Sequence, residues 1–164
     1  MPPTTELPTS IGERPQSVSA LDSHLGFWLR YVSNHVSSQF EKRLKTKDVS
    51  VSEWVALRQL FQVGKSSAVE LMNSLGMTKG AISKIVTRLQ AKGLVTRAVV
   101  NTDRRAQFLA LTPLGQELVP QLAQLADEND DAFFGHLSSD QRTQLIEMMQ
   151  ELVARHQLKQ VPVE

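Results

Sequence analysis

Met77-Thr78-Lys79-Gly80-Ala81-Ile82-Ser83-Lys84-Ile85-Val86-Thr87-Arg88-Leu89 is the stretch of this chain that decides its fold. At about 100° per residue, a set of apolar side chains falls within about 60° of Ile82, and we expect it to face a core. The set is Ile82, Ile85, Val86 and Leu89. Small, hydroxyl and basic residues fall on the opposite side, namely Gly80, Ser83, Lys84, Thr87 and Arg88. The stretch therefore predicts a short amphipathic helix whose exposed side can approach a nucleic acid closely.

The N-terminus of this helix adds to the prediction. Thr78 is placed to cap the helix, and Lys79 lies where free backbone N–H groups favour phosphate. Serine, threonine and arginine side chains can contact base edges, and arginine can bind guanine at two points. We therefore predict a DNA-reading surface made of Thr78, Lys79, Gly80, Ser83, Lys84, Thr87 and Arg88. An ordinary solvated helix is the alternative, but a short preceding helix and the turn at Gly76 favour a helix-turn-helix.

A β-hairpin is expected to follow the helix. Residues 94–100 and 107–111 read as two strands, and residues 101–105 read as a polar turn between them. Asp103, Arg104 and Arg105 would then lie at or near the tip, where arginines suit the minor groove of A·T-rich DNA. Asp103 would be repelled by DNA, so it is expected to hold an arginine or to shape the turn. The alternative is a charged hairpin turn without a DNA contact.

Helices are also predicted on both sides of this segment. A long first helix covers residues 24–45, and capping-box spacing at Ser50 and Ser67 begins the second and third helices. The third helix is expected to bury Val69, Leu71, Met72 and Leu75. Thr112-Pro113 begins a fifth helix and Ser138 a sixth. The order is ααααββαα, a mainly α fold. We divide it into a flexible arm (1–20), a first dimerisation helix (21–48), a DNA-binding domain (49–111) and C-terminal dimerisation helices (112–164).

Charge is distributed unevenly along the chain. The net charge of the whole sequence is +1, but residues 64–106 contain eight basic and two acidic residues, and residues 107–164 contain three basic and nine acidic residues. The basic segment predicts a polyanionic partner, and a solvated basic surface is the alternative.

Other features exclude whole classes of function. The absence of cysteine excludes disulfides and thiol sensing. No apolar run is long enough for a membrane span and no signal-peptide core is present, so we expect a cytoplasmic protein. The four histidines are far apart and no catalytic motif occurs, so we expect no cofactor, no metal and no enzyme activity.

Residues about 24–155 resemble the MarR family of winged helix-turn-helix regulators. The signals include Glu70-Leu71, Met77-Thr78, Ile82-Ser83, Arg88-Leu89, Gly93-Leu94-Val95, Arg97, Asp103-Arg104-Arg105-Ala106 and Leu109-Ala110-Leu111-Thr112-Pro113-Leu114-Gly115. The middle third matches the family pattern closely, and the outer helices match only in length and amphipathicity. The resemblance implies that the fourth helix enters the major groove and that Arg104 or Arg105 enters the minor groove.

The resemblance also implies a homodimer formed by the outer helices. A monomer that folds these helices onto its own core is the alternative. Family members often bind small aromatic ligands between the dimer helices and the DNA-binding lobe, and a pocket here could use Trp28, Tyr31, His35 and Trp54. Alternatively, Trp28 and Trp54 are core residues and His35 is an interior or interface group. The sequence thus predicts a homodimeric repressor that binds a palindromic double-stranded operator and is released by a small molecule. A winged protein-interaction module without specific DNA binding is the alternative.

Overall fold

The computed structural model describes residues 18–100 and 103–158, with side chains for all of these except 99, 100 and 103–106. The chain forms two units, residues 1–33 and 34–164. The first unit contains the 3₁₀ helix η1 (Leu21–Ser23) and the beginning of α1 (Leu25–Lys45), which continues into the second unit. The predicted flexible arm lies for the most part outside the described residues.

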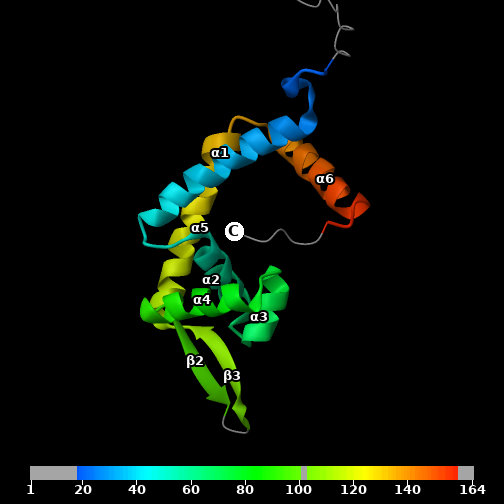
Figure 1. The fold of residues 1–164 in the computed structure, drawn as a ribbon. Coiled ribbons are helices and arrows are strands. Elements are labelled where there is room, and N and C mark those ends of the chain that lie inside the picture. The colour runs from blue at the N-terminus through cyan, green and yellow to red at the C-terminus, as the bar shows by residue number, and fades with distance from the viewer. Residues whose placement is uncertain (1–17, 101–102, 159–164) are drawn as a thin grey trace, which may run out of the picture. The chain divides into compact units, whose positions relative to one another are not determined.

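The second unit contains the remaining elements (Figure 1). The helices are α2 (Val51–Val63), α3 (Ala68–Leu75), α4 (Lys79–Ala91), α5 (Pro113–Phe134) and α6 (Ser139–Arg155). The strands are β1 (Lys65–Ser66), β2 (Val95–Val100) and β3 (Asp103–Leu111). The predicted helices and the hairpin are all present, so the mainly α, winged helix-turn-helix fold is confirmed. Strand β1 was not predicted.

The helix starts follow the predicted capping chemistry. The Ser50 hydroxyl accepts from the Glu53 N–H at 3.2 Å, and the Ser50 N–H donates to the Glu53 carboxylate at 2.9 Å. Ser67 and Glu70 make the same reciprocal pair at 3.2 and 2.7 Å. Because each box satisfies N–H groups that the first turn leaves unpaired, both helix starts are fixed locally.

The three strands form one antiparallel sheet in the order β1-β3-β2. Val99 pairs with Gln107, but Val100 pairs with Asp103, so the register shifts between these two positions. The prediction that residues 101–105 form the turn is therefore wrong in part, because Asp103, Arg104 and Arg105 lie in β3. The strand pairing extends further toward the tip because β3 continues past the register shift to Asp103. Residues 101–102 lie outside the described part of the chain.

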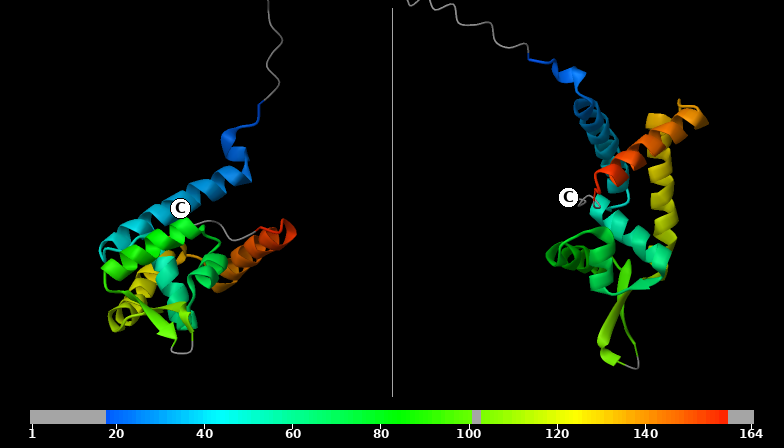
Figure 2. Two further views of the ribbon diagram at one scale, coloured as in Figure 1. Left: turned by 60° about the horizontal axis from the view of Figure 1, so that its bottom comes forward. Right: turned by 90° about the vertical axis from the view of Figure 1, so that its right-hand side faces the viewer.

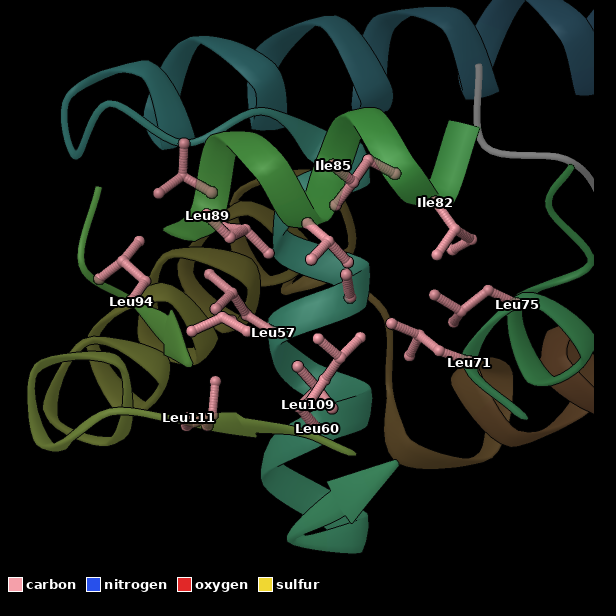
Figure 3. Packing of buried hydrophobic residues seen from close by; sticks show 14 of the residues in the cluster. Leu57, Leu60, Leu71, Leu75, Ile82, Ile85, Leu89, Leu94, Leu109 and Leu111 are labelled. Atoms are coloured by element: carbon pink, nitrogen blue, oxygen red, sulfur yellow. The ribbon is translucent and has the colours of Figure 1, made fainter. Parts of the chain in front are cut away.

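A single cluster of buried apolar residues unites α2, α3, α4 and the sheet. Side chains from all of these elements point toward one another in Figure 3. The prediction for the face of α4 is confirmed, since Ile82, Ile85, Val86 and Leu89 are all buried. The expected burial of Val69 is wrong, because its side chain is 62% exposed. Leu71 and Leu75 of this short helix face the core, and Val69 lies about 200° from Leu71 around the helix axis.

The β2–β3 hairpin projects from the helices of the second unit in every view (Figures 1 and 2). Helix α5 packs on α2 and the sheet, whereas no residue of α6 is buried. None of the helices in residues 18–158 has the length and apolar character that a membrane span requires.

Candidate nucleic-acid interface

Helix α4 presents the predicted reading surface to solvent. All of its members are exposed, namely Thr78, Lys79, Gly80, Ser83, Lys84, Thr87 and Arg88. The surface is held rigidly because the opposite face of the helix is anchored in the core. The geometry therefore agrees with the predicted arrangement, but contact of these residues with DNA stays a prediction.

Backbone N–H groups add positive potential at the start of α4. The Thr78 hydroxyl accepts from the Ala81 N–H at 3.2 Å, and the Thr78 carbonyl accepts from the Ile82 N–H at 3.0 Å. The N–H groups of Lys79 and Gly80 come earlier and have no acceptor within the helix. Together with the exposed Lys79 ammonium, they suit a phosphate oxygen.

Gly80 is not required by the fold. A Cβ atom built at this position meets no atom within 4 Å, and its φ is not in the left-handed region. Glycine within a helix costs up to roughly 0.5–1 kcal/mol relative to alanine, and neither space nor backbone conformation among the described residues calls for glycine at this position. A nearly flat helix surface at Gly80 therefore favours close approach of a binding partner.

A hydrogen bond within α4 limits the contacts that the Thr87 hydroxyl can make with a binding partner. Its Oγ1 donates to the backbone carbonyl of Ser83 at 2.8 Å. The hydroxyl proton is therefore engaged within the helix, and the oxygen lone pairs and the methyl group remain for a partner. A threonine in this state suits the methyl group of thymine or a base-edge donor.

A groove of about 300 Å³ runs beside α4 between α3 and the hairpin strands. Its polar lining consists of Lys79, Ser83, Arg97 and Gln107. Arg97 Nη1 donates to Gln107 Oε1 at 3.1 Å across the two strands, which orients the guanidinium. Sequence reasoning missed Arg97 as a site residue, although a basic residue two positions after buried Val95 shares its side of the strand.

Helix α3, which precedes α4, has a titratable side chain in its capping box, that of Glu70. The pKa of Glu70 is lowered, chiefly by the Ser67 backbone N–H and next by the Ser67 hydroxyl, both of which bind the charged carboxylate. The ionised carboxylate therefore stabilises the first turn of α3. Among the described side chains, no group of histidines and carboxylates is arranged to hold a metal ion.

The predicted wing contacts are described only as backbone. Asp103, Arg104 and Arg105 lie in β3 beside the register shift, and their side chains lie outside the described residues. The minor-groove contact of Arg104 or Arg105 and the role of Asp103 in holding an arginine or shaping the turn therefore stay predictions.

The predicted ligand residues belong to different units. In the first unit, Trp28 and Tyr31 have ring centroids 6.3 Å apart, and Trp28 Nε1 donates to the Asp22 carbonyl at 2.8 Å. Trp28 is exposed, so its alternative assignment to the core is wrong. In the second unit, Trp54 packs edge-on against Phe40 at 6.4 Å beside the core, whereas His35 is exposed. Trp54 thus has a packing role, and the ligand pocket stays a prediction.

Comparison with known proteins supports the same family. Residues 47–106 match the model of the MarR family. The fold is similar to Bordetella bronchiseptica BpsR, whose structure concerns regulation of its DNA binding by 6-hydroxynicotinic acid, with a TM-score of 0.71, 20% identity, and coverage of 83% of this chain and 97% of that one. A mutant E. coli MarR bound to operator DNA gives a TM-score of 0.70, 22% identity, and coverage of 79% and 93%.

A ligand-bound relative completes the comparison. Rhodococcus jostii RHA1 CouR bound to p-coumaroyl-CoA gives a TM-score of 0.71 and 22% identity, and the match covers 82% of this chain and 95% of CouR. At these sequence identities the solved structures show a shared fold. The match to the family model covers the segment that contains α3, α4 and most of the β2–β3 hairpin. Residues 47–106 of the chain are therefore similar to the MarR family, and the whole chain shares the winged-helix fold of these regulators.

Proposed function

We propose that this protein is a homodimeric repressor that binds a palindromic DNA operator and is released by a small aromatic ligand. The observation that carries the DNA proposal is the exposed basic and hydroxyl surface of α4, which includes a glycine that the fold does not require. Helix α4 would enter the major groove, and Arg104 or Arg105 would enter the adjacent minor groove. The proposal places the protein in the cytoplasm, where its operator is.

The dimer proposal rests on an apolar stripe along α6. Ile146, Met149, Leu152 and Val153 recur at helical spacing, and all are 40–48% exposed. A monomer that folded α6 onto its own core would bury this stripe. We assign residues 21–48 and 112–164 to dimerisation, because one recognition helix covers only a few base pairs and specific sites usually need two, spaced about 34 Å apart.

The ligand proposal rests on the exposed aromatic residues of α1 and on the relatives. BpsR is regulated by 6-hydroxynicotinic acid and CouR binds p-coumaroyl-CoA, so both respond to or bind aromatic compounds. We propose the same class for this chain, with Trp28, Tyr31, His35 and Trp54 as candidate contacts. A panel of aromatic acids that includes 6-hydroxynicotinic acid should lower operator binding. A panel without any effect would contradict this part of the proposal.

Selection of bound duplexes from a random pool, followed by footprinting, tests the DNA proposal directly. We expect a palindrome whose half-sites are centred about one helical turn apart. A selected pool without a common sequence, from protein that is folded, would refute specific DNA recognition. A protein-interaction module would behave in that way, and its binding would depend only weakly on salt, whereas DNA binding should weaken steeply as salt rises.

Two substitutions separate reading of bases from binding of phosphates. Arg88→Ala should cost roughly 1–3 kcal/mol and relax the preference at one base pair. Lys79→Ala should weaken binding to all duplexes about equally. It should also reduce by about one the salt slope, which is the slope of the logarithm of the binding constant against the logarithm of the salt concentration. Lys45→Ala removes a similar charge from α1 and should change neither property. Equal losses on every duplex for Arg88→Ala and Lys79→Ala would contradict the division of roles.

A further inference from the structure

Lys92, directly after α4, makes contacts that the reading surface does not use. Its ammonium lies 3.0 Å from Glu53 Oε2 and 3.5 Å from Asp48 Oδ2, and it also donates to the Asp48 backbone carbonyl. An ammonium has three donors, and two of them form hydrogen bonds with the Glu53 carboxylate and the Asp48 carbonyl. The side chain is therefore a specific tether and not a solvated lysine.

The acceptors lie at the junction between α1 and α2. The Glu53 side chain is 3% exposed, and the oxygen that binds Lys92 also accepts the Ser50 N–H of the α2 capping box. Asp48 lies in the turn after α1 with a φ of 55°, in the left-handed region. Its carboxylate is 91% exposed, so that ion pair is weak, and the strong contacts are those to buried Glu53 and to the Asp48 carbonyl.

The contacts of Lys92 constrain the last turn of α4, which contains Arg88. Lys92 follows Arg88 by four residues, which is one helical turn, and both line a single hollow of about 320 Å³ together with Glu41 and Lys45 of α1. A buried carboxylate needs its partner, so the end of α4 cannot move away from Glu53 without a large cost. The position of the Arg88 backbone is thereby fixed relative to the start of α2 and to the turn after α1.

We propose that Lys92 is a positioning residue, which sets the C-terminal turn of the recognition helix and couples it to the end of α1. The inference rests on the proposed DNA-reading function of Arg88. Because α1 is also assigned to the dimer, the Asp48 contact gives a direct route by which a change at the dimer helices reaches the reading helix. Lys92 itself makes no DNA contact in this scheme.

Three variants test the proposal. Lys92→Met removes the ammonium and keeps most of the stem. The double variant Glu53→Gln/Lys92→Met avoids an unpaired buried carboxylate, and glutamine at this position can still complete the capping box. Lys45→Met is the matched control, because it removes a lysine from the same hollow whose ion pair with Glu41 is exposed.

The first readout needs no DNA. Backbone hydrogen exchange in the free protein should become faster at residues 88–92 and 46–50 in the double variant, and it should be unchanged in Lys45→Met. Unchanged exchange at both segments in a folded double variant would overturn the tether, whatever the protein binds.

The second readout uses the selected operator. In the double variant, discrimination against a substitution at the base pair read by Arg88 should fall about tenfold, while the salt slope stays that of the wild type. A smaller salt slope with intact discrimination would make Lys92 a phosphate contact and refute positioning. Lowered thermal stability with intact discrimination would refute it as well. If wild-type protein selects no operator, the proposed function fails, and the exchange measurement still decides whether the tether exists.

Discussion

At the scale of single residues, two glycines offer a matched comparison. Gly26 and Gly80 are each the second residue of a helix, and a Cβ at either position meets no atom within 4 Å. Changing either to alanine should raise the free energy of unfolding by up to about 0.5–1 kcal/mol in urea titrations, because alanine loses less entropy on folding. Only Gly80→Ala should weaken operator binding, by about fivefold, on the order of 1 kcal/mol. Equal operator affinity for the two variants would contradict close approach of DNA at Gly80.

The capping carboxylate of α3 gives a prediction about pH. Because the pKa of Glu70 is lowered on folding, its ionised cap stabilises the protein above the unfolded pKa, and this contribution is lost as the pH falls through the lowered value. Ser67→Ala removes the hydroxyl but keeps the backbone N–H, so the pKa of Glu70 should rise only part of the way to its ordinary value. Ser74→Ala, which removes a hydroxyl that bonds to Leu71, should leave it unchanged. Carboxyl-carbon NMR titrations check both, and identical titrations in all three proteins would contradict the assigned cause.

At the scale of elements, the junction between α4 and α5 depends on one close contact. A Cβ at Gly115 would lie 2.2 Å from the Leu94 carbonyl oxygen, which also accepts the Thr112 N–H at 3.0 Å. Gly115→Ala must therefore displace the start of α5 from the strand that follows α4. We expect a loss of about 1–3 kcal/mol in urea unfolding, whereas Gly80→Ala should cause no loss. A stability equal to the wild type would show that this junction can relax freely.

Local signals explain which elements could be predicted from the sequence. Some signals depend only on residues that are close together in the sequence. They include the capping boxes at Ser50 and Ser67 and the apolar period of α4, so these helices were predicted correctly. Strand β1 has only two residues and exists because it pairs with β3, more than forty residues later in the chain. No local pattern marks such a strand, and the register shift in the hairpin is equally a property of pairing.

The residues of the candidate site also differ in whether a local sequence pattern predicts their placement. The exposed face of α4 follows from helical geometry alone, so each of its residues was correctly predicted to be exposed. Lys92 and Glu53 are 39 positions apart, and Arg97 meets Gln107 only through strand pairing. Contacts of this kind depend on the tertiary fold, and a single sequence without related sequences gives no signal for them.

At the scale of the whole molecule, the uneven charge favours one orientation toward DNA. The basic excess of residues 64–106 coincides with α3, α4 and most of the hairpin, whereas the acidic excess of residues 107–164 falls mainly on α5 and α6. Phosphates attract the first segment and repel the second, so the proposed dimerisation helices should stay away from the duplex. This division leaves the apolar stripe of α6 free for a second copy of the chain.

The stripe on α6 therefore makes the last prediction. Met149 lies at its centre, so Met149→Glu should place a charge in the proposed dimer interface and convert the protein to monomers in sedimentation experiments. Gln144→Glu adds the same charge about 140° away on the same helix and should leave the dimer intact. The monomer should lose the palindrome preference and bind one half-site weakly, because its α4 surface is unchanged. If Met149→Glu remained dimeric and kept its preference for the palindrome, the second recognition helix would have to be brought to the operator by another surface of the chain.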